Sequence, residues 1–199
     1  IKGRLKNIHL PAKDAMHPVF EAIGNSFHAV EDRKSGATGA ISVHVNRDER
    51  VLSQDKEQKR HTIPIIGFTV EDNGVGFTQE NHQSFCTCDS TYKAERGGKG
   101  IGRLLWLKAF EQVAIESTYS QEGKHYRRSF SFNENAGVAD EKIEELDSSK
   151  ALKHKTTVAL SGLRRNYQAS ISKRADTLAR EILNHMLSYF ISSKCPKVM

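Results

Sequence analysis

The sequence contains few cysteines, and their spacing excludes a disulfide-stabilised protein. Cys86, Cys88 and Cys195 are the three cysteines among its 199 residues, an odd number without the spacing of a disulfide framework. One residue separates Cys86 from Cys88, fewer than the two to four that normally separate a zinc-binding pair. We therefore interpret all three as reduced thiols of a cytoplasmic protein without a zinc site.

Apolar runs long enough to cross a membrane are also missing. The longest apolar segment, IPIIGFTV at residues 63–70, is far shorter than the roughly 20 residues that a membrane-spanning helix needs. No charged segment followed by an apolar one opens the chain, so no secretion signal is expected. Because the chain begins at Ile1 rather than Met, we expect it to be part of a longer protein with downstream domains.

Internal repeats and low-complexity linkers are absent as well, which favours one α+β unit over residues 1–199. Basic residues exceed acidic ones by 30 to 24, which gives a net charge of +6. This charge permits contact with nucleic acid but does not demonstrate it. The basic residues are spread along the chain, so most of them are interpreted as a solvated surface.

Hydrophobic periodicity predicts a helix over residues 13–32. Its apolar side chains fall on one stripe, and Glu21, Asn25, His28 and Asp32 lie together on another side. A second helix is predicted over 103–110 and an amphipathic one over 172–192, beyond a core of about 13–163. Strands are predicted over 40–45, 62–71, 113–119, 126–133 and 156–163, a mobile loop over 78–96, and a charged, solvated segment over 140–150.

The sequence DNGVG follows the predicted strand 62–71. Gly74 and Gly76 permit positive φ and the close approach of a flat ligand. Asp72 is suited to accept a hydrogen bond from an exocyclic amine such as that of adenine. On this motif alone a simple turn is an equally good interpretation, since Asp-Asn-Gly is strong turn chemistry.

A second glycine motif, GGKGIG, runs from Gly97 to Gly102 and opens a predicted helix. Backbone N–H groups at a helix start form an anion site, and Lys99 adds a positive charge. The spacing is neither that of a P-loop nor that of a Rossmann fingerprint. A glycine-rich connection is the alternative interpretation.

Glu21 and Asn25 lie one helical turn apart. A carboxylate at this position can orient and deprotonate a water molecule, and the Asn carbonyl is a suitable Mg²⁺ ligand. Surface helices often carry such pairs, so the pair is informative only together with the glycine motifs.

Taken in order, these motifs resemble those of the GHKL ATPases, which include gyrase-type topoisomerases, ninety-kilodalton heat-shock chaperones, sensor histidine kinases, MutL-type repair proteins and MORC proteins. The ExxxN motif matches Glu21 to Asn25, and DxGxG matches Asp72 to Gly76. The GxxGxG motif matches Gly97, Gly100 and Gly102, and the Thr at the head of a late strand matches Thr156. The resemblance spans about residues 15–163 and is closest in style to MutL, MORC and the chaperones.

The resemblance implies a Bergerat fold, a two-layer α/β sandwich whose mixed, mostly antiparallel sheet carries helices on one face. It also implies the cofactors ATP and Mg²⁺, with Glu21 as general base and Asn25 as Mg²⁺ ligand. Asp72 would anchor adenine, supported by Thr156 through a water molecule. The resemblance implies that residues 78–96 form an ATP lid, in which Ser90 and Lys93 are similar to the Ser and Lys of MutL and MORC lids. Gly97, Gly100 and Gly102 would form the hinge and phosphate-facing end of this lid, and Lys93, Lys99 and Ile101 would also contact ATP.

Two positions depart from the family pattern, which often has Asp in place of His28 and Gly in place of Lys155. The resemblance implies slow ATP hydrolysis, with nucleotide driving self-association of a larger ATPase. One alternative is the catalytic domain of a histidine kinase, against which Glu21 argues because a water-activating base suits hydrolysis. Another is a nucleotide-gated binding module without turnover.

Overall fold

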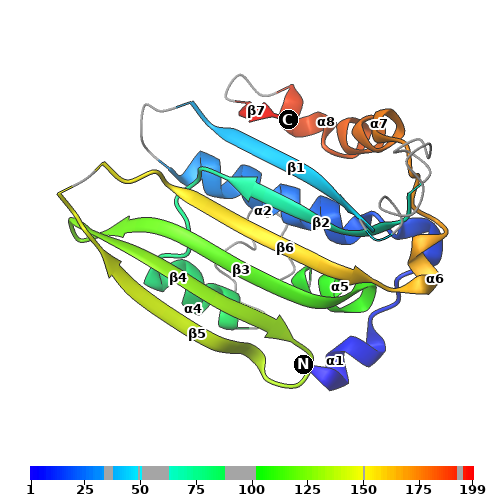
Figure 1. Ribbon diagram of the computed structural model, residues 1–199, viewed down its shortest axis with the longest axis horizontal. Coiled ribbons are helices and arrows are strands. Elements are labelled where there is room, and N and C mark those ends of the chain that lie inside the picture. Colours follow the sequence, from blue (N-terminus) through cyan, green and yellow to red (C-terminus); the bar gives the residue numbers. More distant parts are fainter. Residues whose placement is uncertain (34–37, 49, 51–62, 88–101, 150, 192–194) are drawn as a thin grey trace.

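In the part of the chain that the structure describes, seven strands form one sheet, and the helices form a second layer (Figure 1). The computed structural model describes residues 1–33, 38–48, 50, 63–87, 102–149, 151–191 and 195–199. The strands lie in the order β5-β4-β3-β6-β2-β1-β7. All neighbours are antiparallel except β1 and β7, which run parallel. The strands are β1 (Ala40–Arg47), β2 (Ile65–Asp72), β3 (Phe110–Gln121), β4 (Lys124–Asn133), β5 (Gly137–Leu146), β6 (Lys155–Leu163) and β7 (Lys197–Val198).

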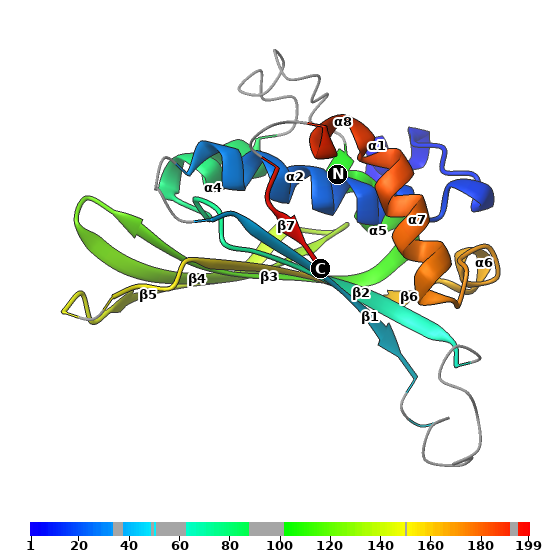
Figure 2. The ribbon, with the colours of Figure 1, turned by 90° about the horizontal axis from the view of Figure 1, so that it is seen from above.

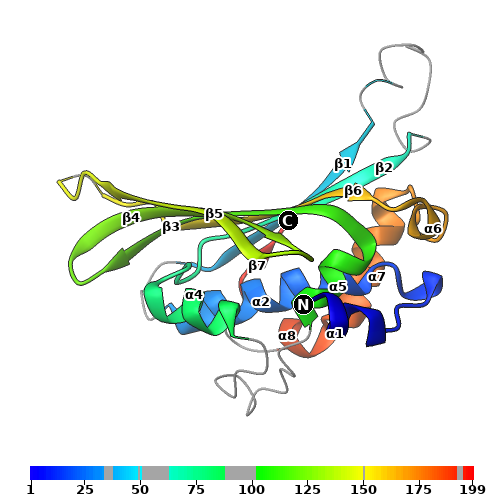
Figure 3. The ribbon, with the colours of Figure 1, turned by 90° about the horizontal axis from the view of Figure 1, so that it is seen from below.

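Helices cover one face of this sheet, and in the described residues no helix covers the other face (Figures 2 and 3). The helix α2 lies along the centre of the covered face, with α4 and α5 beside it (Figure 3). The predicted α+β class and the one-sided helix layer are confirmed. The helices are α1 (Lys2–Asn7), the 3₁₀ turn η1 (Ala12–Asp14), α2 (His17–Asp32), α4 (Gln79–Cys86), α5 (Gly102–Ala109), α6 (Arg165–Gln168), α7 (Ala175–His185) and α8 (Leu187–Phe190).

The apolar stripe predicted for α2 forms the centre of the core. Val19 and Ile23 are fully buried and belong to the same hydrophobic cluster as Phe68 of β2 and Leu160 of β6. The indole Nε1 of Trp106 on α5 donates a hydrogen bond to the carbonyl of Pro18 over 3.0 Å, so α5 is fixed against the first turn of α2. Burial of such side chains is the main stabilising contribution to the two-layer arrangement.

Several predicted elements differ from the observed ones. The first long helix begins at His17 rather than near residue 13, because residues 12–14 form the separate turn η1. The predicted helix over 172–192 is interrupted at Met186, which separates α7 from α8. The charged segment 140–150 is exposed as expected, but most of it belongs to strand β5, which pairs with β4.

The prediction of a loop over 78–96 is also wrong in its first part, because residues 79–86 form α4. The Thr78 hydroxyl accepts a hydrogen bond from the backbone N–H of Asn81 and caps this helix. Residues 88–96 lie outside the described part of the chain.

A buried arginine fixes the start of α4 to the sheet. Arg128 of β4 is 1% exposed, and its guanidinium donates hydrogen bonds to the carbonyls of Phe77 (2.7 Å) and Thr78 (3.0 Å). It donates a third to Oε1 of Gln79 (2.7 Å). Its Nε lies 3.1 Å from the Glu141 carboxylate as an ion pair without hydrogen-bond geometry. Arg128 therefore fixes the first residue of α4 and the two residues before it to the sheet.

We expect Arg128→Ala to lower the free energy of unfolding by about 3 kcal/mol, because it removes a buried guanidinium and leaves two part-buried carbonyls without that donor. The matched control is Arg127→Ala, at the preceding position of β4, where an exposed ion pair with Glu144 is lost. That change should cost less than about 1 kcal/mol. Urea denaturation of both variants checks this, and equal costs would contradict the anchoring role of Arg128.

Candidate functional site

Asp72 lies buried at the end of β2, facing α2. Its Oδ2 accepts a hydrogen bond from Ser26 Oγ on α2 over 2.8 Å, and its Oδ1 accepts one from the backbone N–H of Gly74 over 2.8 Å. Burial raises the pKa of Asp72 to about 6, although the hydrogen bonds from Gly74 and Ser26 oppose this rise. Each carboxylate oxygen can accept a further hydrogen bond, so Asp72 is a fixed acceptor at the edge of the core.

Thr156 lies beside Asp72 because the two residues are register partners on β6 and β2. Its hydroxyl shares a hydrogen bond of 2.9 Å with Ser117 Oγ on β3. Ser117 Oγ also accepts the backbone N–H of Phe77 over 3.0 Å. The central strands thus present a carboxylate and two hydroxyls at one end of the sheet, all buried.

The loop after β2 is packed directly against α2. A Cβ atom on Gly74 would lie 2.5 Å from the carbonyl carbon of Ala29, so no larger residue fits without a shift of the backbone. The N–H of Val75 donates to the carbonyl of Ala29 over 2.9 Å. Gly76 has a φ of +78°, which favours glycine. The two glycines of DNGVG are therefore required by close approach and by backbone conformation.

The helix α2 brings Glu21, Asn25 and His28 onto one stripe, as predicted. Glu21 reaches solvent, yet protein atoms surround much of its side chain. This partial burial raises its pKa, and nearby His17 opposes the rise. His28 forms a hydrogen bond of 2.9 Å with the hydroxyl of Tyr189 on α8, and Tyr189 also stacks on Phe27. The C-terminal helices therefore border the stripe.

The second glycine motif is described only at its last residue. Gly102 begins α5 and lies against the Glu21 carboxylate. The structure thus places Asp72 and Thr156 together beneath Ser26 of α2, and Gly102 against Glu21 on an earlier turn of the same helix. Asn25 lies exposed on α2 between these two places. Ser90, Lys93, Gly97, Lys99, Gly100 and Ile101 lie outside the described residues.

The fit of Mg²⁺ can be judged from the donors present. Asn25 is exposed, and no described residue forms a hydrogen bond with its side chain. Within the described ranges, no group of three or more His, Cys, Asp or Glu side chains could hold a metal ion. One amide oxygen suits an ion that takes its other ligands from water and phosphate, as Mg²⁺ does.

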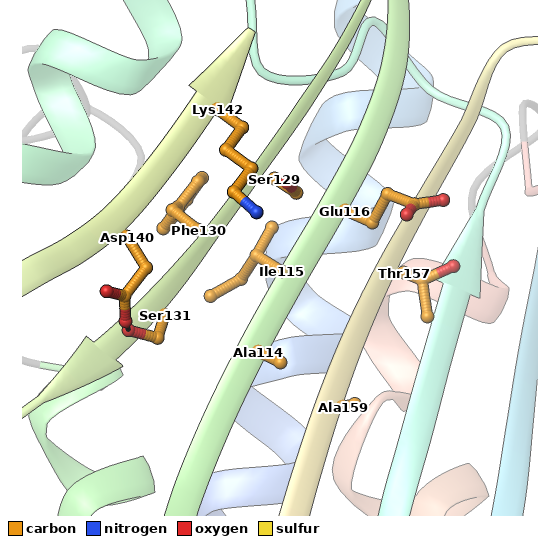
Figure 4. A pocket seen from close by; sticks show the side chains of 10 residues that line it. All are labelled: Ala114, Ile115, Glu116, Ser129, Phe130, Ser131, Asp140, Lys142, Thr157 and Ala159. Carbon is orange, nitrogen blue, oxygen red and sulfur yellow. Dashed lines mark hydrogen bonds between the residues drawn. The ribbon is translucent and has the colours of Figure 1, made fainter.

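A shallow hollow lies on the opposite, uncovered face of the sheet (Figure 4). Small side chains such as Ala114, Ala159 and Ser129 form its floor, with Glu116 and Lys142 also lining it. None of the predicted site residues lines this hollow. The polar groups assembled beneath α2 therefore form a separate site on the helical face.

Sequence reasoning missed two residues that support this site, Ser26 and Ser117. Both are polar residues at inward positions, Ser26 in the apolar stripe of α2 and Ser117 in the alternating strand that carries Ile115 and Tyr119. A buried hydroxyl requires a hydrogen-bond partner, so a serine at a position that the pattern predicts to face the core indicates a buried polar contact.

Comparisons with known proteins bear on the fold. Neither a protein-family model nor a curated protein sequence matches the chain. A solved structure that it resembles holds the ATPase and transducer domains of DNA topoisomerase II from Balamuthia mandrillaris, with a TM-score of 0.53 and 14% sequence identity. The chain shares the fold of this ATPase-domain structure, an α+β fold with a mostly antiparallel sheet and helices on one face. At this identity the likeness establishes the fold alone.

The similarity extends over most of this chain but less than half of the other structure. It covers 87% of the present chain and 43% of the topoisomerase chain. The activity of the whole topoisomerase is therefore not transferred with the fold. In the described residues no helix combines the length and apolar character needed to span a bilayer.

The close contact between the DNGVG loop and α2 gives a test with an internal control. We expect Gly74→Ala to lower the free energy of unfolding by about 1–3 kcal/mol, because its Cβ meets the Ala29 backbone. Gly24→Ala, on α2 with no described atom outside its own helix backbone within 4 Å of the new Cβ, should raise it by about 1 kcal/mol through helix propensity. Thermal unfolding measures both, and destabilisation by Gly24→Ala would contradict the geometry.

The buried carboxylate of Asp72 predicts a pH dependence of stability. Its folded-state pKa of about 6 lies above the usual 3.8, so the folded state binds this proton more tightly than the unfolded chain does. The contribution of Asp72 to stability therefore grows as the pH falls through 6 and is lost as the pH rises. From pH 7 to pH 5 the wild type should gain about 1 kcal/mol relative to Asp72→Asn. Parallel pH dependence of the two proteins in urea denaturation would contradict the assigned pKa.

Proposed function

We propose that this chain is a GHKL-type ATP-binding domain of a larger ATPase, closest in style to the MutL, MORC and chaperone groups. It binds ATP with Mg²⁺ and hydrolyses ATP slowly. The observation that carries the proposal is the buried Asp72 carboxylate, held by Ser26 and Gly74 beside the Thr156 hydroxyl. A desolvated acceptor with further lone pairs gives specificity for a ligand that donates a hydrogen bond there.

In this proposal the exocyclic amine of adenine donates to Asp72, and Thr156 supports the base through a water molecule. The loop of Gly74 and Gly76 approaches the base without side chains in the way. The phosphates extend along the polar stripe of α2 toward Gly102.

Glu21 would accept a proton from the water molecule that attacks the γ-phosphorus, with ADP as the leaving group. Its raised pKa suits this role, because a stronger base takes the proton more readily. Asn25 would hold Mg²⁺, which would supply charge that neutralises the phosphates. Lys93 and Lys99, with the glycines at 97 and 100 and Ile101, are proposed to add contacts to the phosphates.

Nucleotide binding would order the segment between α4 and α5 and promote association of two such domains. We place residues 1–199 as one domain, followed by others in a cytoplasmic protein. These parts of the proposal rest on the motif resemblance and on the fold.

The proposal is tested by two variants that separate binding from hydrolysis. Glu21→Ala should retain ATP affinity within about threefold and lose at least about 100-fold in turnover, because the base is removed. Asp72→Asn should weaken ATP binding by at least about tenfold, because one acceptor oxygen becomes a donor. Calorimetric binding and single-turnover hydrolysis of radiolabelled ATP measure the two effects.

Two outcomes would contradict these assignments. Unchanged turnover of Glu21→Ala would show that Glu21 is not the base, and unchanged affinity of Asp72→Asn would show that adenine is bound elsewhere. ATP binding without turnover in the wild type would instead favour a nucleotide-gated binding module. Phosphate transfer to a protein histidine would favour a kinase.

A further inference from the structure

The Glu21 carboxylate lies against the one residue of α5 that has no side chain. A Cβ atom added to Gly102 would lie 2.0 Å from Oε2 of Glu21 and 2.5 Å from its Cδ. These separations are far below van der Waals contact, so the observed position of the carboxylate is compatible only with glycine at residue 102.

Few other contacts from the described part of the chain determine where this carboxylate lies. No described residue donates a hydrogen bond to Glu21, and the ionisable groups near it are His17 on α2 and Tyr189 on α8. The position of Gly102, in contrast, is fixed, because Trp106 one turn further along α5 is bonded to Pro18 at the start of α2. Gly102 is therefore a fixed boundary for the Glu21 carboxylate, which accepts no hydrogen bond from a described residue.

We propose that Gly102 is a positioning residue for Glu21, and that its missing side chain provides the space in which the carboxylate faces the attacking water. This inference rests on the proposed function. It assigns Gly102 a role separate from any contact with phosphate and from any hinge movement of the chain before it.

The obstacle at Gly102 differs from that at Gly74. At Gly74 a Cβ meets backbone, whereas at Gly102 it meets the end of a flexible side chain. In Gly102→Ala the carboxylate can rotate away at small cost, and alanine is favoured over glycine in a helix. We therefore expect a displaced base in a folded protein, with turnover reduced about 10–100-fold and ATP affinity changed less than about threefold.

Rescue by a shorter base tests this proposal. Glu21→Asp withdraws the carboxylate by one methylene, so a Cβ at residue 102 no longer collides with it. The double variant Glu21→Asp with Gly102→Ala should then turn over ATP within about twofold of Glu21→Asp alone. Gly3→Ala, in α1 with nothing within 4 Å of the new Cβ, is the control for the substitution itself.

Titration of Glu21 gives a second readout, which does not need turnover. Partial burial raises the pKa of Glu21. If the carboxylate rotates into water in Gly102→Ala, its pKa should fall toward the ordinary value. Carbon-13 NMR of the glutamate carboxyls, assigned with Glu21→Ala, follows this shift, and the acid limb of the turnover profile should move to lower pH in parallel.

The outcomes distinguish this inference from the proposed function. Loss of turnover in Glu21→Ala together with full turnover and an unchanged Glu21 titration in Gly102→Ala would overturn only the positioning role. Equal losses from Gly102→Ala in the Glu21 and Glu21→Asp backgrounds, or a loss confined to ATP affinity, would also overturn it. Full turnover in Glu21→Ala would instead reject the proposed function.

Discussion

The hydrogen bond from Ser26 to Asp72 joins the central helix to the end of the central strand, and the arrangement of the site depends on it. A buried carboxylate is costly to desolvate, so it is tolerated only where fixed donors surround it. Here one donor comes from α2 and the other from the loop that the same carboxylate caps. The bond therefore fixes the height of α2 above the sheet and the path of the DNGVG loop together. Because Glu21 and Asn25 belong to α2, their positions relative to Asp72 are fixed as well.

The parts of the site that sequence could predict are those encoded by local spacing. Glu21 and Asn25 share a face because they are one helical turn apart, and Gly76 is required by its own backbone conformation. Ser117 joins the site only through strand register, paired with Thr156 across 39 positions of the chain. No local pattern contains that register, although a serine at an inward position marks a buried group that needs a partner.

The predictions of the fold that are wrong have similar causes. The segment QENHQSFC has almost no apolar periodicity, and α4 forms there because Thr78 caps it and Arg128 holds its first residues. Strand β5 is charged on both faces, so it lacks the alternation that identifies a half-buried strand. It forms a strand because it pairs with β4. In both cases tertiary contacts override a weak local preference. The strongly periodic α2 needed no such support.

The contact between Tyr189 and His28 has a consequence for the order in which the protein is made. These two residues are separated by 161 positions, and α7 and α8 lie against the first long helix (Figure 2). A chain still emerging from the ribosome completes α2 early and Tyr189 late. Until then the polar stripe of α2 lacks the helix α8 beside it. The site is thus assembled only after α8 has been synthesised, and a shorter nascent chain lacks the complete surface that the folded domain presents to a ligand.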